Sequence, residues 1–106
     1  MVYRHMKNTL DYLMDNPPAP LARVVNLSKE DCDVYIGRPS KWGNPYKLGR
    51  DGTRFEVILK YRAYVTEQID NGVLDISELQ GKRLGCYCAP KACHGDVLTE
   101  LANLSR

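Results

Sequence analysis

The chain has 106 residues, of which 43% are hydrophobic and 26% charged, with a net charge of +2. This length fits one domain with a modest core, and the near-neutral charge excludes a global basic field for nucleic acid, so any basic surface must be local. No apolar run approaches the roughly 20 residues of a membrane span, and the N-terminus lacks the apolar stretch of a signal peptide. We therefore expect no membrane contact and a cytoplasmic location, the host cytoplasm if the protein is encoded by a phage, where thiols stay reduced.

The first predicted element is a helix over residues 3–15, where apolar side chains recur near helical spacing. The prolines of "DNPPAP" end it, because they supply no amide donor and disfavour helix before them. We interpret residues 1–20 as a helical arm with a proline-rich linker, which packs on the main body or contacts a partner such as a host protein. Residues 21–106 are expected to form a single domain.

Three short strands are predicted, over residues 22–27, 33–37 and 82–88. The first, "ARVVNL", is β-branched and apolar, and we expect it in the centre of the sheet. Before the third strand, "VLDISELQGK" indicates a further short strand or a turn of helix.

Two helices are predicted in the domain. One begins at Arg54, with Asp51 or Thr53 as its cap and Gly72 at its end, and its apolar face is expected to consist of Phe55, Ile58, Leu59, Val65 and Ile69. The other closes the chain over residues 95–104. Strands separated by helices indicate an α/β domain, with a sheet of three to four strands, at least partly parallel, and flanking helices.

The long loop "RPSKWGNPYKLGRDGT" joins the second strand to the first of these helices. It carries four cations with no acid among them, and these are Arg38, Lys41, Lys47 and Arg50. Cations beside Trp42 and two tyrosines suit a ligand that has a phosphate and a flat ring, and the glycines let backbone amides approach a phosphate. The alternative is an exposed loop whose tryptophan packs on the core and whose lysines are solvated.

The stretch "GCYCAPKACHGD" (85–96) holds three of the four cysteines. Cys93 and His94 fall at the start of the closing helix, where the helix dipole favours a thiolate, although Asp96 in the first turn opposes this. His94 can act as a general base or orient a substrate. A loop after a strand and before a helix is where parallel sheets bind ligands. Cys93, His94 and Asp96 are therefore the candidate catalytic or orienting residues.

Two other interpretations of this stretch stay open. Cys86, Cys88, Cys93 and His94 offer four zinc ligands within nine residues. Because Cys93 and His94 are adjacent, both would have difficulty reaching one ion. Cys32 is the candidate to replace one of these four ligands. Alternatively the cysteines are buried core residues, and Gly95 and Asp96 only cap the helix.

The segments "VYIGRPSKWGNPY" and "GKRLGCYCAPKACHGDVLTELAN" resemble an uncharacterised family of small phage and bacterial proteins, known as a domain of unknown function. The resemblance covers residues 23–104 and rests on two motifs, G-R-P-S-K-W-G-N-P and C-x-C-x-P-x-x-C-H-G-D. It implies an α/β fold with a site at the junction of the last strand and helix. The family has no assigned reaction, so the resemblance leaves enzymatic activity open.

The leading hypothesis is a domain that binds a nucleotide or another phosphorylated, ring-bearing ligand and takes part in nucleotide or nucleic-acid metabolism. Arg38 and Lys41 would contact the anion, Trp42 would stack and Asn44 would hydrogen-bond. The full predicted binding set is Gly37, Arg38, Ser40, Lys41, Trp42, Gly43 and Asn44. The alternatives are a zinc-stabilised module that binds nucleic acid or protein, and a phage protein that contacts a host partner without chemistry.

Overall fold

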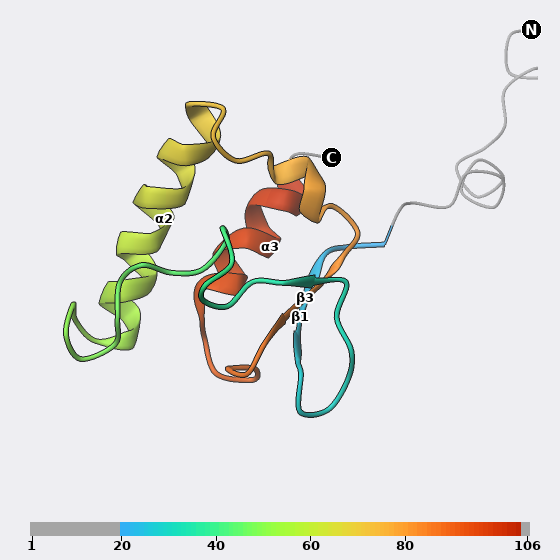
Figure 1. Ribbon diagram of the computed structural model, residues 1–106, viewed down its shortest axis with the longest axis horizontal. Coiled ribbons are helices and arrows are strands. Elements are labelled where there is room, and N and C mark those ends of the chain that lie inside the picture. The colour runs from blue at the N-terminus through green and yellow to red at the C-terminus, as the bar shows by residue number, and fades with distance from the viewer. Residues whose placement is uncertain (1–19, 105–106) are drawn as a thin grey trace, which may run out of the picture.

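A computed structural model describes residues 20–104 and has an α/β fold (Figure 1). Its elements, in chain order, are β1 (Arg23–Asn26), β2 (Val34–Tyr35), α2 (Arg54–Asp70), the 3-10 helix η2 (Ile76–Leu79), β3 (Arg83–Cys86) and α3 (His94–Leu104). The helix predicted over residues 3–15 lies outside the described residues, as does the arm up to residue 19.

The sheet has three strands in the order β1-β3-β2, and both pairs of neighbours are parallel. Leu84 of β3 pairs with Val24 on one side and Val34 on the other. The predicted fold class is therefore confirmed, but the prediction that β1 is central is wrong. The burial of the strands agrees with this order, since three of the four residues of β3 are buried, whereas β1 begins with the exposed Arg23.

Helix α3 lies between the sheet and α2, so the domain has three layers (Figure 1). Its buried side chains are Val97, Leu98 and Ala102. Gly95 permits the close approach of its first turn to the sheet: a Cβ at that position would lie 2.8 Å from side-chain carbons of both Ile36 and Val24. This packing holds the start of α3 against the strand ends.

Helix α2 is rotated relative to the face that the sequence predicts. Phe55 and Leu59 were expected to be buried, but they are 70% and 50% exposed, whereas Val57, Tyr61 and Val65 face the core. The physical reason is that Tyr61 can be buried completely, because its hydroxyl donates a hydrogen bond to a backbone carbonyl. Of the residues named here, only Val65 was predicted to be buried and is buried.

The ends of α2 match the sequence more closely. Thr53 is the N-cap and forms a capping box with Glu56. Gly72, just beyond the helix, has φ of +76°, as expected for a residue that ends a helix in the left-handed region. Within residues 20–104 no helix is long and apolar enough to cross a membrane.

All three strands run in the same direction, so their carboxyl ends lie at one edge of the sheet. The loop after β2 (36–53) and the loop after β3 (87–93) both leave from this edge. Because β2 and β3 are neighbours, the two sequence motifs begin side by side.

Candidate functional site

A cavity of about 440 Å³ lies at the carboxyl edge of β2 and β3. Both loops and the start of α2 line it. The lining residues are Tyr35, Gly37, Arg38, Asn44, Tyr46, Leu48, Arg54, Val57, Ile58, Cys86, Tyr87, Cys88, Ala92, Cys93 and His94. The two motifs that the sequence marks thus contribute to one cavity, at the place where parallel sheets bind ligands.

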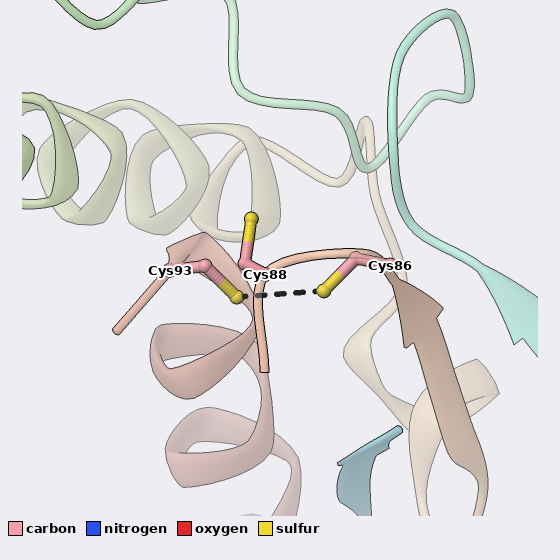
Figure 2. Close-up of side chains that lie close together, drawn as sticks. All are labelled: Cys86, Cys88 and Cys93. Carbon is pink, nitrogen blue, oxygen red and sulfur yellow. Dashed lines mark hydrogen bonds between the residues drawn. The ribbon is translucent and has the colours of Figure 1, made fainter. Parts of the chain in front are cut away.

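Three cysteines gather in the wall of this cavity (Figure 2). The Sγ atoms of Cys86, Cys88 and Cys93 all lie within 4.8 Å of one another, and those of Cys86 and Cys93 are 3.7 Å apart. Cys86 and Cys93 are buried and Cys88 is half-buried, and all three are free thiols. This arrangement can hold a metal ion.

The fold of the loop after β3 explains the cluster. Cys86 is the last residue of β3, and the chain then turns back so that Cys93 directly precedes α3. The side chain of Asn26, at the end of the neighbouring strand β1, donates a 2.7 Å hydrogen bond to the carbonyl of Ala89. The turn is also closed by a 2.7 Å backbone hydrogen bond to the carbonyl of Cys88. The cluster therefore depends on the parallel pairing of β1 and β3.

His94 is not part of this group, although the sequence offers it as a fourth zinc ligand. Its Nε2 lies 2.7 Å from the carbonyl oxygen of Ile36. A carbonyl can only accept, so Nε2 carries the proton and Nδ1 keeps its lone pair in the neutral ring. Burial lowers the pKa of His94, which favours this neutral form, while the contact with Ile36 opposes the shift. The set of four zinc ligands that included His94 is therefore not assembled here.

The thiol of Cys93 differs from the activated thiolate that its position before a helix predicts. Burial, followed by the neighbouring Cys86, raises the pKa of Cys93 to about 12. The backbone of Gly95 acts in the predicted direction and lowers the pKa, but burial outweighs it. Without a cation beside it, this thiol stays protonated at neutral pH.

Asp96 serves the start of α3. Its Oδ2 accepts a 3.1 Å hydrogen bond from the backbone N–H of Cys93, which is the bond that the third residue of a helix makes back to the N-cap in a capping box. Asp96 is exposed and is not among the lining residues of the cavity. The capping role is the structural alternative that the sequence leaves open for this residue.

Trp42 is buried in the core, with 2% of its surface exposed. Its carbonyl accepts the hydroxyl of Tyr61 at 2.6 Å. With no exposed ring face, Trp42 packs inward, which is the alternative that the sequence leaves open for this loop, and this conformation does not support its stacking on a ligand. The same spacing of lysines around a tryptophan fits both a ligand platform and a residue that packs inward.

Three further residues of the predicted binding set do not line the cavity either. Lys41 forms a 2.7 Å ion pair with Glu78. Gly43 packs against Arg38, where a Cβ would lie 3.1 Å from the Arg38 Cα. The hydroxyl of Ser40 is buried and has no hydrogen-bond partner in the part of the chain that the structure describes.

Asn44, which was expected to bind the ligand, lines the cavity but also anchors the loop. Its Nδ2 donates to the carbonyl of Val57 in α2 at 3.3 Å, and its Oδ1 accepts from the N–H of Tyr46 at 2.9 Å. These bonds fix the loop after β2 to the helix. Its amide is thus largely used within the protein.

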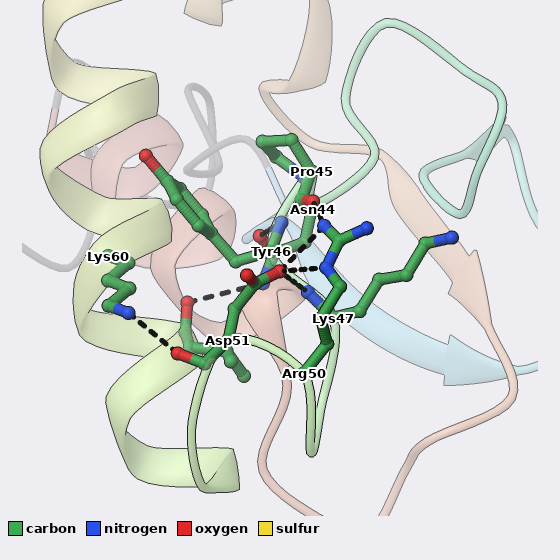
Figure 3. Close-up of polar contacts among 8 residues, drawn as sticks. Asn44, Pro45, Tyr46, Lys47, Arg50, Asp51 and Lys60 are labelled. Carbon is green, nitrogen blue, oxygen red and sulfur yellow. Dashed lines mark hydrogen bonds and ion pairs between the residues drawn. The ribbon is translucent and has the colours of Figure 1, made fainter.

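The outer part of this loop is closed by Asp51 (Figure 3). One carboxylate oxygen accepts the N–H of Lys47 at 2.7 Å and pairs with Arg50 at 2.7 Å. The amine of Lys60 donates to the Asp51 carbonyl at 2.6 Å. Arg50 is therefore used to shape the loop, and of the four loop cations only Arg38 reaches the cavity.

Several cavity residues lie outside the predicted site set, among them one cation and two exposed tyrosines. Arg54 lines the cavity, and its Nη1 donates to the carbonyl of Ala92 at 3.0 Å, which links the start of α2 to the loop after β3. A cation in the first turn of a helix opposes the helix dipole, and this was a signal of another role. Tyr35 and Tyr87 also line the cavity and are 41% and 68% exposed.

Comparison with known proteins agrees with the resemblance. Residues 21–104 match the family described as "Domain of unknown function (DUF4326)". The chain belongs to this family. It is similar to the "Uncharacterized 12.4 kDa protein in nrdA-td intergenic region" of Enterobacteria phage T4, with 40% identity over 87 residues that cover 78% of this chain and 79% of that protein.

A second relative comes from a giant virus. The "Uncharacterized protein R718" of Acanthamoeba polyphaga mimivirus is 33% identical over 108 residues, which cover 81% of this chain and 82% of that protein. No solved structure matches the chain. The family therefore has phage and viral members, and the function has to be argued from the site.

Proposed function

We propose that the protein binds a small anionic molecule with a flat ring, such as a nucleotide, in the cavity between its two loops. The observation that carries this proposal is the charge of the lining: Arg38 and Arg54 contribute to it, and no lining residue from the described part of the chain is acidic. The volume of about 440 Å³ is that of a small-molecule site and does not extend along a nucleic-acid strand.

Both arginines have guanidinium nitrogens that are available to bind an anion. The guanidinium of Arg38 is exposed and has no ion pair or hydrogen bond among residues 20–104. Arg54 uses Nη1 for the Ala92 carbonyl, which leaves Nη2 without a partner in the same range. Because a guanidinium binds phosphate or carboxylate oxygens in a fixed fork, two of them on one cavity select for an anionic group.

Tyrosine rings replace the buried tryptophan in this proposal. Tyr35, Tyr46 and Tyr87 line the cavity, and two of them are well exposed. Aromatic faces stack on flat rings, and every nucleobase presents such a flat face. The neutral His94 also lines the cavity and offers Nδ1 as a hydrogen-bond acceptor. The proposal is binding and includes no reaction.

The test is calorimetric titration of the full chain with the four ribonucleoside 5′-monophosphates and with adenosine, which lacks the phosphate. We expect at least one monophosphate to bind and adenosine to bind much more weakly. Arg38→Gln and Arg54→Gln should each weaken binding about tenfold or more, because a hydrogen bond to a charged group contributes about 1.5–3 kcal/mol.

Arg62→Gln is the matched control. Arg62 lies on the same helix as Arg54, is exposed and pairs with Glu100, and it is not part of the cavity lining. It should leave the affinity unchanged. The proposal is refuted if Arg38→Gln and Arg54→Gln both bind as tightly as Arg62→Gln and the wild type. It is also refuted if no monophosphate binds.

A second candidate function is zinc binding by Cys86, Cys88 and Cys93. Thiolates around a tetrahedral zinc ion, with Zn–S distances of about 2.3 Å, stand about 3.8 Å apart. The 3.7 Å between the sulfurs of Cys86 and Cys93 is close to that separation. A divalent cation would also displace the proton that burial otherwise keeps on the Cys93 thiol.

The zinc candidate is tested by metal analysis of the purified protein. We expect one zinc per chain, lost in Cys88→Ser but kept in Cys32→Ser, because Cys32 is outside the group of three. Removal of the metal by a chelator should lower the midpoint of thermal unfolding. Stoichiometric zinc in the Cys88→Ser variant would contradict the assignment.

A further inference from the structure

The metal-binding cysteines and the anion-binding arginines share one cavity. Cys86, Cys88 and Cys93 all belong to its lining, as do Arg38 and Arg54. A metal held by the three sulfurs would therefore stand in the cavity wall and not in a sealed part of the core. Figure 2 shows the sulfurs of Cys86 and Cys93 directed toward one another, while the side chain of Cys88 extends to one side of the line between them, with its sulfur within 4.8 Å of both.

The number of protein ligands is one short of a closed zinc site. Structural zinc sites have four protein ligands, whereas sites that act on a ligand have three and keep the fourth position open. Within residues 20–104, no histidine, further cysteine or acidic side chain belongs to the group formed by the three sulfurs. His94 uses Nε2 for the Ile36 carbonyl.

The remaining cysteine, Cys32, lies against Gly85, outside the group of three sulfurs. Cys32 packs on the backbone of the central strand, where its sulfur lies 2.5 Å from the position that a Cβ of residue 85 would occupy. Its packing there accounts for glycine at residue 85, since any side chain would collide with it. Cys32 is therefore not available as the fourth ligand in this structure.

The charges of the cavity support a ligand at the open position. A divalent ion bound by three thiolates carries one net negative charge, which by itself would repel an anion. Arg38 and Arg54 line the same cavity and reverse this sign, and the lining has no acid to oppose them. The two arginines thus make it favourable for an anion to approach the metal.

We propose that the metal bound by Cys86, Cys88 and Cys93 keeps its fourth coordination position open to the cavity, and that the bound anion fills this position while Arg38 and Arg54 hold it. The inference rests on both proposals above, namely anion binding and zinc binding. It defines the ligand as an anion that supplies the metal with a donor atom, such as a phosphate oxygen.

The test replaces zinc by Co²⁺ in the full chain, under reducing conditions and without oxygen. Cobalt bound by thiolates has visible absorption bands that change when its fourth ligand changes. Inorganic phosphate is titrated into the cobalt protein, and its binding is measured separately by calorimetry. We expect the bands to shift with added phosphate until they saturate, and the midpoint of this spectral change to coincide with the midpoint that calorimetry gives.

The variants separate metal from anion. Arg54→Gln should move the spectroscopic midpoint to about tenfold higher phosphate with the cobalt bands at saturation unchanged, and Arg62→Gln should have no effect. Phosphate that binds in calorimetry but leaves the cobalt bands unchanged overturns the inference and leaves anion binding intact. Absence of phosphate binding overturns it together with the anion proposal, and failure of cobalt to bind overturns it together with the zinc proposal.

Discussion

Tyr61 illustrates, at the scale of a single residue, how the loop after β2 is held to the core. Its ring is fully buried, and its hydroxyl donates a 2.6 Å hydrogen bond to the carbonyl of Trp42. Desolvation raises the pKa of this hydroxyl, so it remains a donor across the whole physiological range. This is a buried hydrogen bond among those that join α2 to the loop that carries Arg38.

Tyr61→Phe should lower the free energy of unfolding by roughly 1–3 kcal/mol, because it leaves the Trp42 carbonyl without its partner in the core. The measurement is urea denaturation followed by circular dichroism. Tyr64→Phe is the control: Tyr64 lies on the same helix and is half-buried, and its hydroxyl has no hydrogen bond among the described residues. A loss in the Tyr64 variant as large as in the Tyr61 variant would show that the hydrogen bond contributes little.

Single residues of the site were predictable to an unequal degree. Arg38, Cys86 and Cys93 could be identified, because cations and cysteines in loops after strands point to chemistry. The burial of Trp42 was one of two alternatives that the sequence did not decide between, since depth depends on the partner that a side chain meets, here a tyrosine 19 residues away.

At the scale of elements, β2 is held to the sheet by more than its backbone. It has only two residues. Just before it, Asp33 accepts a 2.8 Å hydrogen bond from the N–H of Arg83 and a 3.0 Å ion pair from the Arg83 guanidinium. These contacts hold the pKa of Asp33 at about 2, chiefly through the side-chain hydrogen bond from Arg83. An acid thus fastens a very short strand to the central one.

The sign of the pH effect follows from this shift. The pKa of Asp33 is lower in the folded state than in the unfolded state, so the carboxylate stabilises the fold above the unfolded value, near pH 4, and this contribution is lost as the pH falls toward 2. Asp33→Asn should therefore unfold at lower urea at pH 7 and show a weaker loss of stability between pH 4 and pH 2.

Glu67→Gln provides the comparison for this experiment. Glu67 is exposed on α2, and its side chain forms no ion pair within residues 20–104. Its variant should follow the wild-type curve. If Asp33→Asn also follows that curve, the pair with Arg83 has no measurable effect on stability.

The elements themselves could largely be predicted, but their rotation and order could not. Strand and helix positions follow from β-branched runs and capping residues such as Thr53. The buried face of α2 was misjudged because apolar side chains occupy more than one side of the helix, and tertiary packing of Tyr61 selects among them. The central place of β3 likewise depends on long-range pairing, which short apolar strands do not reveal.

For the whole molecule, the strand order determines the site. Placing β3 between β1 and β2 brings the loops after β2 and β3 to the same cavity, and Asn26 at the end of β1 supports the cysteine loop. The sequence marks both loops, so their contribution to one cavity was predictable. Arg54 was not identified because it enters the cavity from α2, outside either motif.

The burial of Trp42 has an optical consequence. It is the only tryptophan of the chain and is 2% exposed, in contact with the core and not with the cavity. Its fluorescence therefore arises from an apolar setting and moves to longer wavelength when water enters the core. A ligand that fills the cavity leaves that wavelength nearly unchanged, so the protein contains a natural reporter of unfolding that is separate from binding.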